Sequence, residues 1–497
     1  MAAGVVLDGH GLTPADVAAV VREGRPVNLA EDARARNAAA AAVVEELVEL
    51  GRPIYGVTSG VGGLRARQIP PDQRAGQQLR LLRSHSCGAG RPLPLELVRA
   101  TMVVRANQLG AGGAGVSDEL LNALVAAVNA GFVPFTRELG SLGTADLMVL
   151  ADVALALLGE GRAWRGHEVV DARHVLADAG LAVPRLGPRD GIAFMSSNAM
   201  SIGHSALIAE DARRLIEASL AVASLSFTAA GADTIAVDPR VHDARAHPGQ
   251  AEAAARMRRL LRGTPGGAGA EPPRDVVHDP YPFRALAQVE GATLTALSAL
   301  EAVLAVELNS ASENALVDRA TSSVLSSANF HGGSLALALD HFRAALAQSV
   351  SLVAARVSAL LDEGLMGLPA ALAERPGADS GAMMLEYTAH AAAADVRLRA
   401  TPVTAQTTTV GGGVESHATF TPFAARGAQR ALDSAAVAIA TELVVAVRAL
   451  RMRGVEPPAT TGAGGLFALA AARLDADAND RSLSEDVETA RVLLFAR

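Results

Sequence analysis

The chain has 497 residues, of which half are hydrophobic and only 3% aromatic, with a formal net charge of −8 and a pI of about 5.9. This length exceeds one ordinary hydrophobic core and predicts at least two packed regions. The acidic balance argues against a nucleic-acid partner, which would favour a basic face. All 44 basic side chains are arginine, so chemistry that needs a lysine amine is excluded.

Cysteine and histidine usage excludes further classes. The single cysteine, Cys87, rules out an intrachain disulfide and a cysteine-rich zinc site. The histidines show no metal-ligand spacing, so no metal site is expected. The N-terminal MAAGVVLDGHGL lacks the pattern of a signal peptide. Apolar runs such as residues 218–232 are shorter than the roughly 20 residues of a membrane-spanning helix. We therefore expect a cytoplasmic protein without a membrane partner.

Helix-forming residues dominate the chain. Residues 31–50 predict a helix that ends at Gly51, and longer helices are predicted over 284–309, 334–361 and 424–453. Helices of this length need partners along them, which predicts a mainly α fold built as an elongated helical bundle. Strand-like alternation is scarce, so any sheet is minor.

Glycine-rich segments divide these helices. Loops are predicted over residues 55–63 (YGVTSGVGG), 262–277 and 407–413. The first of them lacks the GK[ST] ending of a phosphate-binding loop, so nucleotide binding is rejected. We expect an N-terminal active-site domain over residues 1–205 and a long-helix domain over 206–497.

Tyrosine is the most informative residue type, because there are only three. Tyr55 opens the first glycine-rich loop, where its phenol can act as a base or simply anchor a turn. Arg284 follows Tyr281 by one turn and can pair with a substrate carboxylate or form a surface ion pair. His85 and His278 are candidate acid–base groups or hydrogen-bonding histidines.

Several motifs, taken in chain order, resemble those of the histidine and phenylalanine ammonia-lyases. They cover almost the whole chain. The matching segments are residues 55–62 (YGVTSGVG), 84–85 (SH), 140–143 (GSLG), 146–147 (DL), 157–161 (LLGEG), 278–284 (HDPYPFR), 313–316 (ENAL), 329–331 (NFH) and 415–417 (ESH).

This resemblance implies a homotetramer in which three subunits contribute to each active site, and a small-molecule carboxylate substrate. It also implies that Tyr55 is the catalytic base and that Arg284 holds the carboxylate. Tyr281 would line the reacting centre, and Glu442 falls where the family has a late active-site glutamate. The remaining substrate-binding residues implied in this way are His85, Ser196, His278, Asn314, Phe330 and Glu415.

The chain departs from the family where the methylidene-imidazolone cofactor is made. The family cyclises an Ala-Ser-Gly tripeptide, whereas the aligned segment here is one residue shorter and contains Thr144, Ala145 and Asp146. Ser196 replaces an asparagine that assists the cofactor. We therefore expect no such cofactor, as in the ergothionase branch of the superfamily.

These features predict a carbon–nitrogen lyase that removes trimethylamine or another good leaving group from an aromatic or imidazole amino acid derivative. The lack of lysine favours a substrate other than ergothioneine. One alternative is an isomerase, cyclase or conjugate-addition enzyme of secondary metabolism. Another is a binding protein without catalysis. An ordinary ammonia-lyase whose cofactor forms from Thr-Ala-Asp is not supported by the chemistry of ring closure.

Overall fold

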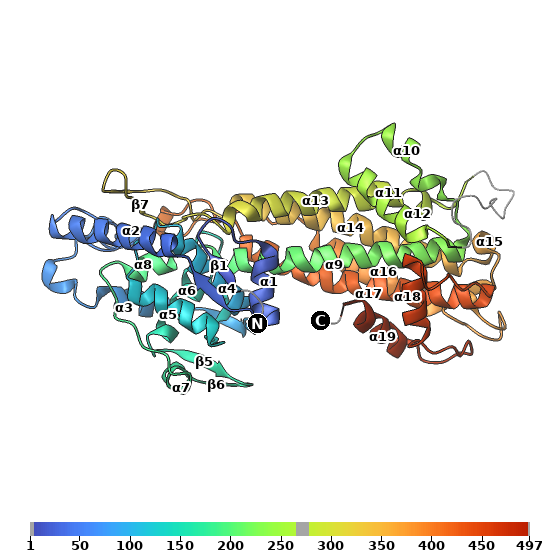
Figure 1. Ribbon diagram of the computed structural model, residues 1–497, viewed down its shortest axis with the longest axis horizontal. Coiled ribbons are helices and arrows are strands. Elements are labelled where there is room, and N and C mark those ends of the chain that lie inside the picture. Colours follow the sequence, from blue (N-terminus) through green and yellow to red (C-terminus); the bar gives the residue numbers. More distant parts are fainter. Residues whose placement is uncertain (1–3, 265–277, 496–497) are drawn as a thin grey trace. The chain divides into compact units, whose positions relative to one another are not determined.

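The computed structural model describes residues 4–264 and 278–495 and is mainly α-helical (Figure 1). The chain forms two compact units, each discontinuous in sequence. The first comprises residues 1–210, 300–339 and 402–426, and the second comprises residues 211–299, 340–401 and 427–497. The first unit thus includes residues 206–210, 300–339 and 402–426, which the sequence-based division places in the second domain.

Short and medium-length helices build the first unit. Many carry clear end signals. Helix α1, for example, starts with a capping box in which Thr13 and Asp16 bond each other's backbone N–H. The helices wholly within this unit are α1 Pro14–Glu23, α2 Glu31–Glu49, α3 Gln77–His85, α4 Leu95–Gly110, α5 Asp118–Asn129, α6 Leu147–Leu157, α7 Ala172–Asp178 and α8 Asp190–Met195.

Sheet content is minor, as predicted. Within the described residues every sheet has two strands, of which β1 and β2 pair in parallel and the others antiparallel. The strands are β1 Val5–Leu7, β2 Val27–Leu29, β3 Ala89–Pro92, β4 Arg137–Leu139, β5 Arg162–Arg165, β6 Glu168–Asp171, β7 Leu316–Asp318 and β8 Ser323–Leu325.

The boundaries between the two units in the sequence fall inside four long helices: α9 Ala199–Ala230, α13 Leu286–Glu307, α14 Gly333–Leu361 and α17 Thr421–Arg453. The last three confirm the predicted long helices. The shorter helices of the second unit are α10 Pro239–Asp243, α11 Pro248–Leu261, α12 Tyr281–Arg284, α15 Glu363–Met366, α16 Met383–Arg399, α18 Gly462–Ala471 and α19 Ser484–Phe495.

A buried polar network joins the long helices inside the second unit. The carboxylate of Glu290 on α13 accepts hydrogen bonds from Ser219 of α9 (3.2 Å) and Ser349 of α14 (2.8 Å). Burial raises the pKa of the Glu290 carboxyl, while the nearby Arg356 acts against this shift. The predicted loop 262–277 begins with a turn over residues 262–264, and residues 265–277 lie outside the described part of the chain.

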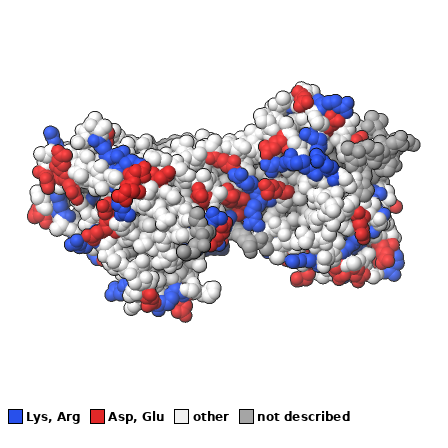
Figure 2. Space-filling model, viewed as in Figure 1, with Lys and Arg blue, Asp and Glu red and all other residues white. Residues whose placement is uncertain are grey.

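Two helices, α13 and α14, are long and apolar enough to cross a membrane by length and composition alone. The core helices of soluble proteins pass the same test, and 67% of the apolar window of α14 is buried inside the structure. Acidic and basic side chains are interspersed over the face drawn in Figure 2, with no single basic area on it.

Candidate active site

A cavity of about 220 Å³ lies in the first unit and collects most of the predicted site residues. Its wall is built by segments far apart in the sequence: the loop before α3, the end of α3, the segment before α6, helix α8 and the segments around residues 314, 330 and 415. The predicted residues that line it are Tyr55, His85, Thr144, Ala145, Ser196, Asn314, Phe330 and Glu415.

Tyr55 is held at both ends of its side chain. Its phenol oxygen accepts a hydrogen bond from the backbone N–H of Gly62 at 2.8 Å. The ring packs against a buried apolar cluster that includes Val44 and Ile192. The hydrogen bond from Gly62 fixes the position of the phenol oxygen in the wall of the cavity. The geometry therefore suits a proton-transfer role.

His85 ends helix α3, and its Nδ1 lies 2.9 Å from the carbonyl oxygen of Leu81 and 3.1 Å from Ser84 Oγ. A carbonyl oxygen only accepts hydrogen bonds, so Nδ1 carries the proton in this contact. The neutral ring then has Nε2 as its acceptor. Nε2 is therefore the nitrogen of His85 that is left to accept a hydrogen bond from a ligand.

Ser196 and Asn314 form a second polar wall. The Ser196 hydroxyl accepts from the Asn314 backbone N–H at 3.0 Å, and Asn314 Oδ1 accepts from the Ser327 N–H at 3.1 Å. Since Ser327 fixes the oxygen end of this amide, the Nδ2 donor group is the end left for a ligand.

The loop that contains Thr144 and Ala145 is tightly bonded. Thr144 Oγ1 donates to Glu415 Oε2 at 2.8 Å, and the Ala145 N–H donates to Asn198 Oδ1 at 3.1 Å. The Asn198 side-chain amide in turn donates to the Phe330 carbonyl. Glu415 is thus anchored through one carboxylate oxygen beside the cavity.

Asp146 does not line the cavity and has a structural role instead. It is fully buried and accepts hydrogen bonds from Ser141 Oγ at 2.6 Å and from the Ser201 N–H at 2.8 Å. Burial raises the pKa of the Asp146 carboxyl, and the hydrogen bonds from Ser141 and Ser201 oppose the rise. Asp146 therefore fixes the loop to the start of α9.

Four predicted residues belong to the second unit and do not line this cavity: His278, Tyr281, Arg284 and Glu442. Tyr281 is 67% exposed, and the Arg284 guanidinium lies 5.6 Å from the centre of its ring. Arg284 Nε donates to the Asp279 carbonyl at 2.9 Å, and the exposed His278 contacts the same carbonyl at 3.3 Å. Within the described residues, both terminal amino groups of Arg284 lack a protein partner, so they can receive a carboxylate.

Glu442 lies in the core of the second unit. Its side chain is completely buried in the second unit and forms a bidentate ion pair with Arg356, with distances of 2.6 and 2.9 Å. Ser226 Oγ also donates to this carboxylate at 2.7 Å. A carboxylate with these partners and no exposed surface is a core group of the second unit, and the catalytic role of Glu442 stays a prediction from the family resemblance.

A histidine pair next to the site has no role among the sequence-based predictions. His331 Nε2 lies 3.0 Å from His417 Nδ1, and the rings are tilted with centroids 5.1 Å apart. Burial and the neighbouring His417 lower the pKa of His331. Both residues were visible in the motifs around Phe330 and Glu415, but their contact joins segments 86 positions apart.

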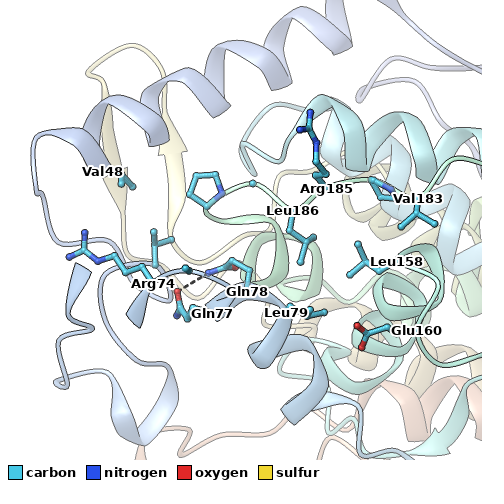
Figure 3. A pocket seen from close by; sticks show the side chains of 16 residues that line it. Val48, Arg74, Gln77, Gln78, Leu79, Leu158, Glu160, Val183, Arg185 and Leu186 are labelled. Carbon is cyan, nitrogen blue, oxygen red and sulfur yellow. Dashed lines mark hydrogen bonds between the residues drawn. The ribbon is translucent and has the colours of Figure 1, made fainter. Parts of the chain in front are cut away.

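A larger cavity of about 540 Å³ lies behind the Tyr55 loop (Figure 3). Its lining combines apolar side chains such as Val57, Leu158 and Leu186 with the amides of Gln77 and Gln78. No sequence motif predicts it. Across the described ranges, no group of three or more His, Cys, Asp or Glu residues is arranged to hold a metal ion.

Residues 12–473 match the sequence model of the family described as aromatic amino acid lyase. Histidine ammonia-lyase from Treponema denticola is 34% identical over 485 residues, which cover 97% of this chain and 95% of the relative. Histidine ammonia-lyase from Symbiobacterium thermophilum is 35% identical over 483 residues, covering 97% and 94%.

Comparison with solved structures gives the same family likeness. The ergothioneine-degrading enzyme ergothionase from Treponema denticola superposes with a TM-score of 0.93 at 26% identity, covering 99% of this chain and 98% of that one. Tyrosine aminomutase from Streptomyces globisporus also gives 0.93, at 30% identity and with coverage of 99% and 97%. The fold and the cavity thus define a carbon–nitrogen lyase of the ammonia-lyase type. The chain belongs to the aromatic amino acid lyase family.

The comparisons overturn the prediction that no methylidene-imidazolone is involved, because the curated relatives are histidine ammonia-lyases, which use this group. The loop residues, however, do not fit its ordinary formation. Thr144 and Ala145 supply no serine followed by glycine, and their hydroxyl and N–H groups are bonded to Glu415 and Asn198.

Proposed function

We propose that this protein removes an amine from an aromatic or imidazole amino acid derivative and releases an aryl acrylate. The observation that carries the proposal is the Tyr55 phenol, held by the Gly62 N–H in a cavity that His85, Asn314 and Glu415 also line. Tyr55, acting as the phenolate, takes the β-proton and becomes the neutral phenol. The electron pair of the broken C–H bond forms the double bond between the two carbons, and the amine leaves the α-carbon with the electron pair of the C–N bond.

Within this proposal, trimethylamine or a similarly good leaving group is favoured. It departs as a neutral amine from a quaternary ammonium, so it needs no proton from the enzyme. The likeness to ergothionase over 99% of the chain supports this choice. Glu415 is placed beside the cavity to face a positively charged or proton-donating ring.

We further propose that the substrate carboxylate binds Arg284 and that Tyr281 covers the reacting centre. Both residues would come from other copies of the chain in a homotetramer, as the family resemblance implies. The terminal amino groups of Arg284 match the two oxygens of a carboxylate. Its partial stacking on Tyr281 orients the guanidinium.

The test uses matched pairs of substrates and follows the ultraviolet band of the conjugated acrylate. Each pair is a free amino acid and its N,N,N-trimethyl betaine: histidine with hercynine, then phenylalanine and tyrosine with theirs, and ergothioneine as a further compound. Product from a betaine and none from its amino acid supports the trimethylamine assignment. Product from a free amino acid would show that ammonia is the leaving group instead. If no compound gives a product, the proposed lyase activity is contradicted.

A second candidate is an isomerase that moves the amine between carbons. The tyrosine aminomutase likeness, at 30% identity over 99% of the chain, favours it. The same incubations separate the two activities when the amine-containing products are resolved by chromatography. A β-amino acid identifies isomerisation, whereas an acrylate with free amine identifies elimination.

A further inference from the structure

Gln78, which no motif singled out, makes a two-sided contact behind the Tyr55 loop. It is the second residue of α3 and only 5% exposed. Its Nε2 donates to the Gly56 carbonyl at 2.9 Å, and its Oε1 accepts from the Ile192 N–H at 3.0 Å. One partner only accepts and the other only donates, so the orientation of the amide is fixed. A single buried side chain thus connects the loop to helix α8.

The contact reaches the residue directly after Tyr55, where the backbone has little freedom. Gly56 has a φ of +71°, and a Cβ at this position would lie 2.9 Å from Ile192 Cγ1. Gln77 Nε2 also donates to the Gly56 carbonyl, at 3.2 Å. The two amides are hydrogen-bonded to each other at 3.2 Å, as the dashed line in Figure 3 shows. Two donors therefore converge on the carbonyl oxygen of Gly56, the residue that follows Tyr55.

Helix α3 extends this arrangement to the other side of the cavity. Gln78 lies near its start and His85 is its last residue, so about 10 Å of rigid helix separates them. On the α8 side, Ile192 lines the cavity and Ser196 follows at the helix C-terminus. Gly191 packs so closely that an added Cβ would lie 2.7 Å from the Gln78 carbonyl oxygen. Loop, α3 and α8 are therefore fixed together at Gln78.

We propose that Gln78 is a positioning residue that sets the location of the Tyr55 phenol relative to His85 and Ser196. This proposal rests on the proposed role of Tyr55 in proton transfer. Proton transfer depends steeply on distance, and a displacement of about 1 Å lowers a rate by roughly 100-fold. Gln78 is too buried to touch substrate itself, so its effect passes through the loop.

Substitutions can remove this contact with little change in volume. Gln78→Met keeps the length of the side chain and removes its hydrogen bonds to Gly56 and Ile192, together with that to Gln77. Gln78→Glu keeps the acceptor for the Ile192 N–H but places a carboxylate against the Gly56 carbonyl. Gln77→Met is the matched control. It removes the longer bond to the same carbonyl and the bond between the two amides, but it keeps the contacts of Gln78 with Gly56 and Ile192.

Steady-state kinetics of the full-length enzyme provide the first test. We expect Gln78→Met to lower kcat by roughly 10- to 100-fold with a change in KM of less than about threefold. Gln77→Met should change kcat by less than about threefold. Gln78→Glu should recover activity relative to the wild type as the pH falls, since the protonated acid can again donate to Gly56. Equal losses in Gln78→Met and Gln77→Met would overturn the proposal.

A double-mutant cycle separates positioning from general damage. If Gln78 acts through the phenol, Gln78→Met should have almost no further effect on the residual rate of Tyr55→Phe. A loss in that background as large as in the wild type would mean that Gln78 supports the fold rather than Tyr55.

Hydrogen exchange tests the positioning even if the enzyme performs no elimination. The Gly62 N–H is bonded to the Tyr55 phenol, so a peptide spanning residues 54–64 reports directly on the loop. We expect faster exchange in this peptide in Gln78→Met and Gln78→Glu. In Gln77→Met the exchange rate should equal that of the wild type. Unchanged exchange in both Gln78 variants would overturn the inference. Lack of turnover by the wild type would instead count against the proposed function.

Discussion

The cavity region of the first unit and the helix core of the second unit hold charged groups in different ways. Glu415 lines the cavity, is half-buried and is bonded through one oxygen to a neutral hydroxyl, that of Thr144. Glu442 is fully buried and has a bidentate arginine partner. A buried charge that is fully paired serves the fold, whereas a partly exposed carboxylate with a free oxygen can meet a ligand. The following predictions test this contrast.

The largest effect is expected at the cavity. Tyr55→Phe removes the proton-accepting oxygen and should lower kcat by roughly 10²- to 10⁴-fold. The measurement is the rate of acrylate formation at saturating substrate. Tyr387→Phe is the control, because that phenol is 64% exposed on α16 and outside the cavity. Equal rates in the two variants would remove Tyr55 from the mechanism.

In the helix core, the expected effect is on stability. Glu442→Gln or Arg356→Met leaves one charge buried without its partner, which should cost about 3–5 kcal/mol of unfolding free energy. Replacing both residues with apolar side chains should cost less than the two single changes added together. Urea unfolding of the three variants checks this. A Glu442→Gln protein of unchanged stability but without turnover would return Glu442 to the active site.

A buried histidine in the first unit makes stability depend on pH. Burial, with a smaller contribution from Arg426, lowers the pKa of His204 from 6.5 to about 4. The unfolded chain therefore binds a proton between these values and the folded chain does not. Stability should decrease as the pH falls from 6.5 towards 4, by roughly 3 kcal/mol in total.

The check is urea unfolding of the wild type and His204→Gln at pH 7 and pH 4.5, where the variant should lose less stability. Asp152 has the opposite effect on the pH dependence of stability, because burial raises the pKa of its carboxyl to about 6. Both proteins contain Asp152, so its contribution cancels in the comparison. Parallel losses in the two proteins would show that His204 is not the source.

The smallest effect is expected at Glu415. Glu415→Gln retains an oxygen that can accept from Thr144 but removes the negative charge, so KM for an imidazole or cationic substrate should rise about 10-fold with kcat largely kept. Thr144→Val is the matched variant, since it removes the hydroxyl and keeps the carboxylate. A Glu415→Gln enzyme with unchanged KM would mean that this carboxylate does not contact the substrate.

Periodic and motif features were predictable from the sequence alone. Helices α13 and α14 are apolar and without internal proline, so their bounds differ from the prediction by only a few residues. Helix α9 was missed as one element. Its first turn follows the Ser196-Ser197-Asn198 segment, which has the composition of a loop, and the predicted domain boundary falls inside it.

Pairings across long separations were not predictable. Nothing near Glu442 in the sequence shows that Arg356, 86 positions away, neutralises it in the core. Gln78 is likewise one of two adjacent glutamines on a helix, and only its contact with Ile192, 114 positions away, distinguishes it. Motif resemblance located Tyr55 and Glu415 because their neighbours are unusual, but burial and partners come only from the folded chain.

The bond between Thr144 and Glu415 also has a consequence for synthesis of the protein. It joins residues 271 positions apart. At about 5–20 residues per second, a ribosome needs roughly 15 to 55 s to pass from one to the other. During that interval the Tyr55 loop and the Thr144 segment exist without the last wall of the cavity. The nascent first unit therefore exposes its interior for tens of seconds, when a chaperone could bind it.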